Sequence, residues 1–135
     1  MSEHKFPVKI GICVFNRATY SRCASVIDEL EKNPKKFNVV LYVSSSLLDK
    51  DYGEASVQID DYYSNKDNVE IVKLPIEYKE KTLIGSCYAA ADVLSVCSER
   101  FNRDELNAVV VVADRFETLP AAMAATYQNI PLIHL

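Results

Sequence analysis

The chain has 135 residues, of which 49% are hydrophobic and 25% are charged, with a net charge of −4 and a pI of about 5.2. This size and composition predict one globular domain with a substantial core. The acidic balance argues against binding to nucleic acid or membranes by bulk electrostatics, and no apolar run approaches the roughly 20 residues of a transmembrane helix. The first residues lack the layout of a signal peptide, so we expect a cytoplasmic protein.

The first third of the chain predicts a strand, a helix and a second strand. Residues 8–15 are mostly apolar and predict the first strand. A helical pattern follows from about residue 20 to 32, and Thr19 or Ser21 can cap its first turn. Residues 39–43 form a second apolar run, which predicts the second strand.

The middle of the chain is more polar. It predicts a loop, a short helix near residues 54–62 and a third strand at residues 69–74, near an edge of the sheet. Residues 81–103 carry the longest helical pattern. The side chains expected on its buried face are Ile84, Cys87, Ala91, Leu94, Ser98 and Phe101.

Four consecutive valines open the last third of the chain, at residues 109–112. An unbroken run of β-branched residues is typical of a strand that is covered on both faces. The charged pair Asp114-Arg115 ends this strand. A helix is expected at residues 117–128, and a fifth strand begins at Leu132.

Strands that alternate with helices predict right-handed crossovers and an α/β fold. We expect a Rossmann-like three-layer α/β/α sandwich whose parallel sheet has the strand order 3-2-1-4-5. This order makes strands one and four neighbours. It therefore brings Asn16-Arg17 beside Asp114-Arg115 at the carboxyl ends of the strands, where open α/β sheets bind ligands.

Two arginines beside a helix N-terminus favour an anionic ligand, because guanidinium groups bind phosphate oxygens in pairs. The sequence has no G-x-G-x-x-G and no G-x-x-x-x-G-K-[ST]. The turn after the first strand also lacks the acidic residues of a response-regulator receiver. These absences favour a nucleotide-sugar or another phosphorylated ligand. A solvated turn or a local ion pair is the alternative explanation of Asp114 and Arg115.

The four cysteines, Cys13, Cys23, Cys87 and Cys97, include no C-x-x-C pair, and the two histidines lie at opposite ends of the chain. This spacing predicts no metal site and no redox motif. Each cysteine lies in an apolar pattern, so we expect four buried free thiols.

Four segments carry a further signal. They read N-R-A-T-Y-S at 16–21, L-D-K-D-Y-G at 48–53, A-D-R-F-E at 113–117 and N-I-P-L-I-H at 129–134. They resemble the N-R-A-D-Y-S, L-x-D-D-Y-G, G-D-R-F-[DE] and N-I-P-x-x-H motifs of the hydrolysing UDP-N-acetylglucosamine 2-epimerases, in particular the sialic-acid pathway branch. Thr19 and Ala113 replace the Asp and the Gly of these motifs.

The resemblance implies half of a glycosyltransferase-B type fold, with residues 1–135 as a single Rossmann-like domain truncated at its C-terminal end. It implies a UDP-sugar substrate and no cofactor, and it leaves a homo-oligomer open. Members of this family eliminate UDP from UDP-N-acetylglucosamine and add water to the glycal, which gives N-acetylmannosamine. By position, Asp114 would be the acid/base carboxylate. Arg17 and Ser21 would bind the nucleotide side of the substrate, and Arg115 the diphosphate.

Two other functions fit the same residues. One is a stand-alone flavodoxin-like domain that binds a nucleotide or a partner without catalysis. The other is an enzyme that acts on phosphorylated metabolites and is unrelated to epimerases. Because the resemblance places a second domain and a further carboxylate after His134, we expect the 135-residue chain to be inactive by itself.

Overall fold

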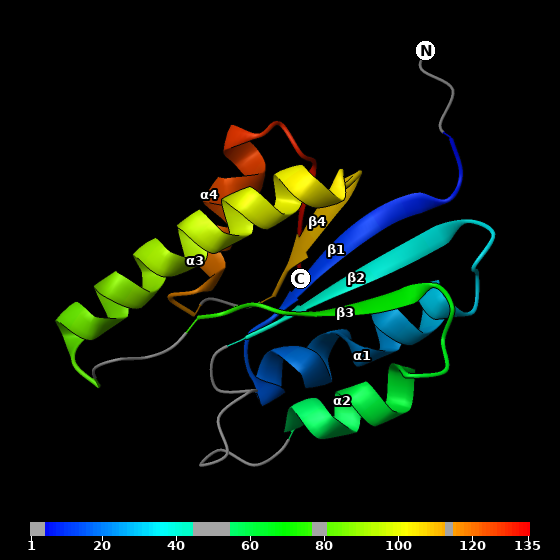
Figure 1. Cartoon of the computed structure of the whole chain (residues 1–135), viewed down its shortest axis with the longest axis horizontal. Coiled ribbons are helices and arrows are strands. Elements are labelled where there is room, and N and C mark those ends of the chain that lie inside the picture. The colour runs from blue at the N-terminus through cyan, green and yellow to red at the C-terminus, as the bar shows by residue number, and fades with distance from the viewer. Residues whose placement is uncertain (1–4, 45–54, 77–80, 113–114) are drawn as a thin grey trace.

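A parallel sheet of five strands lies between two pairs of helices (Figure 1). The computed structural model describes residues 5–44, 55–76, 81–112 and 115–135. The strands are β1 (Val8–Val14), β2 (Phe37–Val43), β3 (Val69–Lys73), β4 (Ala108–Val111) and β5 (Leu132–His134). The helices are α1 (Arg17–Glu31), α2 (Ala55–Tyr63), α3 (Leu83–Asp104) and α4 (Thr118–Tyr127). The sheet order is β3-β2-β1-β4-β5, so the predicted fold class and strand order are confirmed.

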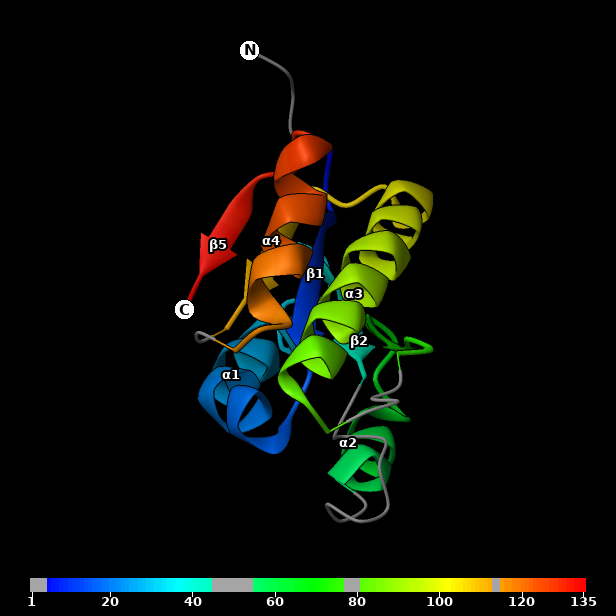
Figure 2. The ribbon, with the colours of Figure 1, turned by 90° about the vertical axis from the view of Figure 1, so that its left-hand side faces the viewer.

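Each face of the sheet has its own core, because successive side chains of a strand point to opposite faces. Val111 packs with α3 and α4 on one face, and Val110 packs with α1 and α2 on the other. Their exposed fractions are 2% and 3%, which confirms that β4 is covered on both sides. Figure 2 shows α3 and α4 side by side over the sheet, with β5 at the edge away from α2.

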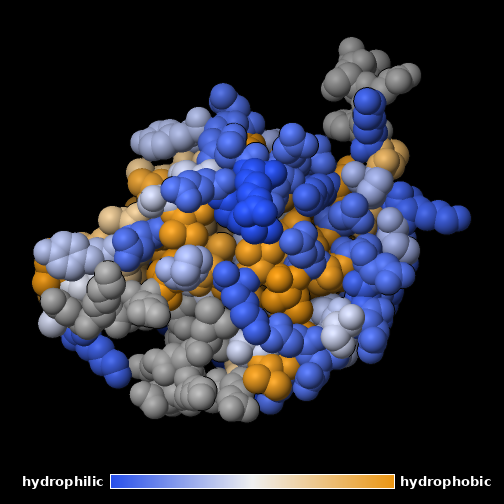
Figure 3. Space-filling model, viewed as in Figure 1, coloured by the Kyte–Doolittle hydropathy of each residue, from blue (hydrophilic) through white to orange (hydrophobic). Residues whose placement is uncertain are grey.

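The surface follows the same layering. On the face drawn in Figure 3, hydrophobic residues gather between the two helix layers, and hydrophilic residues cover the outer sides of the helices. Within the described ranges, no helix combines the length and the apolar character needed to cross a membrane.

Helix α1 begins three residues earlier than the sequence pattern predicted. Its cap is Asn16, so the prediction that Thr19 or Ser21 caps it is wrong. The Asn16 Oδ1 atom accepts a hydrogen bond from the Thr19 amide at 2.9 Å, and the Asn16 amide donates to Thr19 Oγ1 at 3.2 Å. This reciprocal capping box satisfies two backbone donors and fixes where the helix starts.

Helix α3 buries a different face from the predicted one. The buried positions are spaced by four residues, at Gly85, Ala89, Val93, Cys97 and Phe101. The predicted residues Ile84, Cys87 and Ala91 are exposed, while Leu94 and Ser98 are half-buried. The helix runs alongside α4, with which Val93, Cys97 and Phe101 share one core, and this contact decides which face of α3 is buried. Phe101 is buried as predicted.

The cysteine prediction needs one correction that follows from this rotation of α3. Cys13, Cys23 and Cys97 are buried free thiols, as expected, whereas Cys87 is exposed. Burial raises the pKa of the Cys23 thiol to about 11 and that of the Cys97 thiol to about 12. Burial, together with Cys97 and Cys23, also raises the pKa of the Cys13 thiol.

All strands run in one direction, so the sheet has an amino edge, where strands begin, and a carboxyl edge, where they end. The central strands are in register, with Val14 beside Val43 and Ile12 beside Val110. The residues that follow β1, β2 and β4 therefore meet at the carboxyl edge. This is the edge at which parallel sheets of this class bind ligands.

Candidate functional site

The N-terminus of α1 forms the first part of the candidate site. Asn16 has an exposed fraction of 5% and joins the end of β1 directly to the helix. Thr19 is also buried, and its hydroxyl donates to the Asn16 carbonyl at 2.8 Å. The capping box thus holds the first turn of α1 against the carboxyl edge, and the amides of that turn favour an anion.

Arg17 and Ser21, two of the predicted substrate-binding residues, lie on the exposed side of this helix start. Arg17 is the first residue of α1, so its side chain is attached to the backbone at the carboxyl edge of the sheet. The Ser21 hydroxyl donates to the Arg17 carbonyl at 3.0 Å, one turn along the helix. The two residues therefore share one exposed strip at the start of α1.

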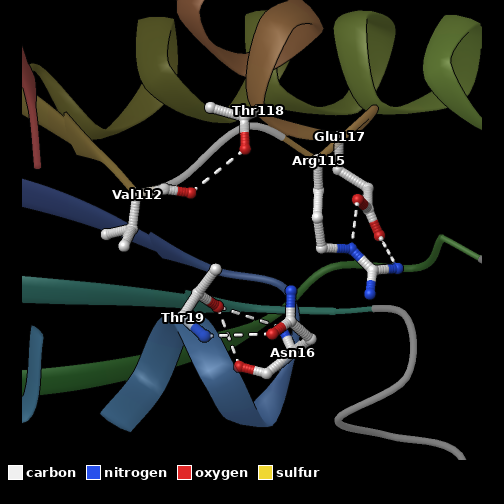
Figure 4. A network of polar contacts seen from close by, with 6 residues as sticks. All are labelled: Asn16, Thr19, Val112, Arg115, Glu117 and Thr118. Carbon is white, nitrogen blue, oxygen red and sulfur yellow. Dashed lines mark hydrogen bonds and ion pairs between the residues drawn. The ribbon is translucent and has the colours of Figure 1, made fainter. Parts of the chain in front are cut away.

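Arg115 follows β4 and is held by a carboxylate that the sequence analysis did not single out. Its Nε and Nη2 atoms donate to the two carboxylate oxygens of Glu117, at 3.0 and 3.1 Å (Figure 4). The Glu117 side chain has an exposed fraction of 0%, and that of Arg115 has 43%. A two-point contact of this kind fixes the plane of the guanidinium group as well as its position.

The start of α4 is anchored to the same strand. The Thr118 hydroxyl donates to the Val112 carbonyl at 3.2 Å (Figure 4). The Thr118 amide donates to the Arg115 carbonyl at 2.9 Å. These contacts close the turn between β4 and α4. Arg115 thus forms an ion pair with Glu117, a partner that the sequence analysis did not name, and its exposed part lies at the carboxyl edge.

The predicted catalytic residue, Asp114, lies outside the described residues, as does the segment at 48–53. The structure brings three predicted residues to the same edge: Arg17, Ser21 and Arg115. It adds Glu117 and Ser44, which is fully buried directly after β2. Glu117 had a sequence signal, since it is an acidic residue at the start of a helix two positions after Arg115. Ser44 had none, because it is one serine of a polar run.

Metal binding has no support in the described part of the chain, where no group of three or more histidine, cysteine, aspartate or glutamate residues could hold an ion. The chemistry available at the carboxyl edge is that of two guanidinium groups, one of them paired with the Glu117 carboxylate, together with the amides of a helix start and neutral polar side chains. This set suits a ligand that combines phosphate groups with uncharged oxygen atoms.

Comparison with known proteins gives a consistent picture. No protein-family model matches the chain. The polysialic acid biosynthesis protein P7 of Escherichia coli is 28% identical over 127 residues, which are 94% of this chain and 31% of that protein.

Solved structures match the fold more strongly than the sequence. A putative UDP-N-acetylglucosamine 2-epimerase from Listeria monocytogenes superposes with a TM-score of 0.77 at 18% identity, over 97% of this chain and 32% of the other. The UDP-GlcNAc 2-epimerase from Neisseria meningitidis, solved with UDP-GlcNAc bound, gives 0.73 at 20% identity, over 95% and 32%. The arrangement is that of half of a glycosyltransferase-B type fold, as predicted. The chain thus has the fold of an N-terminal part of the UDP-N-acetylglucosamine 2-epimerases, and it spans about a third of their length.

Proposed function

We propose that this chain is the N-terminal portion of a hydrolysing UDP-N-acetylglucosamine 2-epimerase, which converts UDP-N-acetylglucosamine into N-acetylmannosamine and UDP. The observation that carries the proposal is the position of Arg17 and Arg115, which follow neighbouring central strands and reach the same edge of the sheet. The similarity to a structure with bound UDP-GlcNAc supports a UDP-sugar as the ligand. The similarity to a polysialic acid biosynthesis protein supports the sialic-acid branch.

The two arginines act on the diphosphate. Elimination of UDP leaves negative charge on the departing diphosphate, and guanidinium groups stabilise that charge. Arg115 is held in place by Glu117, so little side-chain entropy is lost when it meets the ligand. Arg17 and Ser21 bind the nucleotide side of the substrate from the first turns of α1.

Asp114 moves the proton at C2 of the sugar in this proposal. Epimerisation needs a group that removes and returns a proton, and a carboxylate is suited to this role. The sequence A-D-R-F-E places Asp114 directly beside Arg115.

The chain by itself is expected to bind UDP weakly and to be inactive. Catalysis of this type needs a closed site that excludes water and fixes the sugar. The arginines lie on an exposed edge, where water and salt screen their charges. We expect a dissociation constant for UDP on the order of millimolar, and no release of UDP from UDP-N-acetylglucosamine.

The binding test is a titration of the isotope-labelled chain with UDP, followed by amide chemical shifts. Shifts should cluster at the starts of α1 and α4, and Arg17→Ala should weaken binding about fivefold or more, since a charge-assisted contact is lost. Arg103→Ala is the matched control, because Arg103 is an exposed arginine in the last turn of α3. Equal affinities for the two variants would contradict the assignment of the site.

The activity test follows free UDP after incubation of the concentrated chain with UDP-N-acetylglucosamine. Turnover above background that disappears in Asp114→Asn would show that the chain is a complete enzyme. That result would leave the epimerase proposal in place and reject the proposed inactivity of the chain.

A further inference from the structure

Two buried side-chain atoms in the described part of the chain make no hydrogen bond: Asn16 Nδ2 and Ser44 Oγ. Buried polar groups are nearly always paired, because a buried group without a partner has lost its hydrogen bonds to water and gained none in return. Both atoms lie at the carboxyl edge, one after β1 and the other after β2. Two unrelated packing defects would not be expected at the same edge of the sheet. The shared location of the two atoms therefore points to a common role.

The orientation of the Asn16 amide is fixed by its neighbours. Its Oδ1 atom accepts from the Thr19 backbone amide, so exchanging the oxygen and nitrogen atoms would bring two donors together. The group without a partner is therefore an NH₂ donor and not an acceptor. Figure 4 shows this nitrogen turned away from Thr19, to the side on which Arg115 and Glu117 lie.

Ser44 lies at the end of the neighbouring strand. It directly follows β2, and its side chain is fully buried. Because Val14 lies beside Val43, Ser44 follows β2 next to the point where β1 leads into Asn16. The two neutral donors thus follow the ends of adjacent strands, next to the anion-binding start of α1.

A third buried polar side chain shows what a purely structural role looks like. Asn68, with an exposed fraction of 7%, lies at the amino edge before β3. Its Nδ2 atom donates to the carbonyl oxygens of Phe37, Glu31 and Leu30, at 3.1, 3.2 and 3.5 Å. The same amide nitrogen is thus paired at one edge and lacks a partner at the other.

We propose that Asn16 and Ser44 form a neutral subsite that donates hydrogen bonds to an uncharged oxygen of the sugar, a hydroxyl or the acetamido carbonyl. The inference rests on the proposed function and divides the ligand between two sets of residues. The arginines take the charged diphosphate, for which guanidinium groups are the stronger partners. The amide and hydroxyl donors bind a neutral oxygen. They carry no charge, and their directional hydrogen bonds fix the orientation of that oxygen. Since both atoms are shielded from water, the surface at this edge rearranges when the sugar enters.

The first experiment follows the side-chain NH₂ resonances of Asn16 in the labelled chain. UDP-N-acetylglucosamine should shift them downfield, UDP alone should leave them nearly unchanged, and UDP-glucose distinguishes a hydroxyl from the acetamido carbonyl. The NH₂ group of Asn68 is the internal control and should not move with any of these ligands. Equal responses to UDP and to the sugar nucleotides would overturn the neutral subsite.

The second experiment uses Ser44→Ala and measures stability and affinity together. Removing a hydroxyl that has no partner should raise the melting temperature by about 2–4 °C and weaken UDP-N-acetylglucosamine about three- to tenfold, with UDP unaffected. Ser64→Ala, at the far end of α2, is the control for loss of a hydroxyl that already donates to a carbonyl.

Two outcomes would count against the subsite. A lower melting temperature for Ser44→Ala would mean that an ordered water already pairs the hydroxyl. Unchanged affinity for the sugar nucleotide, with normal binding of UDP, would reject the subsite and keep the proposed function. If neither UDP nor the sugar nucleotide bound to the chain, both proposals would be wrong.

Discussion

The two edges of the sheet treat buried polar groups differently. At the amino edge, the Nδ2 atom of the buried Asn68 donates to the carbonyl oxygens of Phe37 and Glu31, at 3.1 and 3.2 Å. Tyr42 and Arg100 both donate to the buried carboxylate of Asp104 at the end of α3. At the carboxyl edge, Asn16 Nδ2 and Ser44 Oγ have no partner in the described part of the chain. A network that is fully paired stabilises a fold, whereas unpaired donors reduce its stability and are available to a ligand.

The largest effect is expected from Asp104→Ala at the amino edge. This change removes the shared acceptor of the Tyr42 hydroxyl and the Arg100 guanidinium, and it should cost about 3 kcal/mol, or about 10 °C in melting temperature. Glu70→Ala is the control, because Glu70 also contacts Arg100 but is 56% exposed, and it should cost less than about 1 kcal/mol. Thermal unfolding followed by circular dichroism measures both. Similar losses in the two variants would mean that the amino-edge network is not a buried unit.

The second prediction makes the same change at both edges. Asn68→Asp replaces a donor that faces three carbonyl oxygens by a carboxylate, and it should cost about 2–3 kcal/mol. Asn16→Asp keeps the capping oxygen and replaces the unpaired donor by a carboxylate oxygen at the start of α1, where the helix amides favour negative charge, so it should stay within about 1 kcal/mol of the parent. Urea unfolding of the two variants gives the comparison. A larger loss for Asn16→Asp would remove the distinction between the edges.

A smaller effect is expected in the middle of the sheet, from Gly11→Ala. A Cβ atom at this position would come within 2.7 Å of Leu106 Cδ1 and 2.8 Å of Tyr42 Cε2. The end of Leu106 can shift, but moving the Tyr42 ring also draws its hydroxyl away from Asp104. We expect a loss of about 1–2 kcal/mol in chemical unfolding. The loss should be smaller in a Tyr42→Phe background, because the contacts with the ring and with Leu106 remain but no hydroxyl is drawn away from Asp104.

The last prediction concerns the reactivity of the four cysteine thiols and involves no change in the stability of the chain. The thiolate is the nucleophile, so a thiol whose pKa is raised by burial reacts slowly below that pKa. At pH 8, Cys23, with a pKa of about 11, and Cys97, with a pKa of about 12, are almost entirely protonated. A thiol reagent should therefore modify the exposed Cys87 first and the other three only as the chain unfolds, which mass spectrometry can follow. Equal rates at all four cysteines would contradict the orientation of α3.

The sequence predicted the sheet better than the helix faces. Alternating strands and helices led to the correct strand order, because the handedness of the crossovers leaves few other arrangements. The buried face of α3 was missed because Gly85 and Ala89 carry little hydrophobic signal. The start of α1 was missed because Asn16 was assigned to the turn, and its capping role depends on the contact with Thr19.

The position of the candidate site could be predicted from the sequence. The hydrogen-bond and ion-pair partners of its residues could not. Arg17 and Arg115 could be brought to one edge from the order of the strands alone. The full burial of Glu117 depends on how α4 approaches the sheet, which no local pattern specifies. The unpaired state of Ser44 likewise depends on the neighbours that surround it in three dimensions. The role of Asp114 stays a prediction.

The pairing of β1 with β4 also bears on how the molecule folds. Ile10 lies beside Ala108, so two adjacent central strands are joined only after nearly a hundred intervening residues are in place. Contacts between residues so distant in sequence form late, since a long loop must close before they contribute. The β1–β2–β3 half can form first as a local unit, with Asn16 and Ser44 at its end. Arg115 and Glu117 belong to the segment of β4 and α4, so we expect the two halves of the site to come together late in folding.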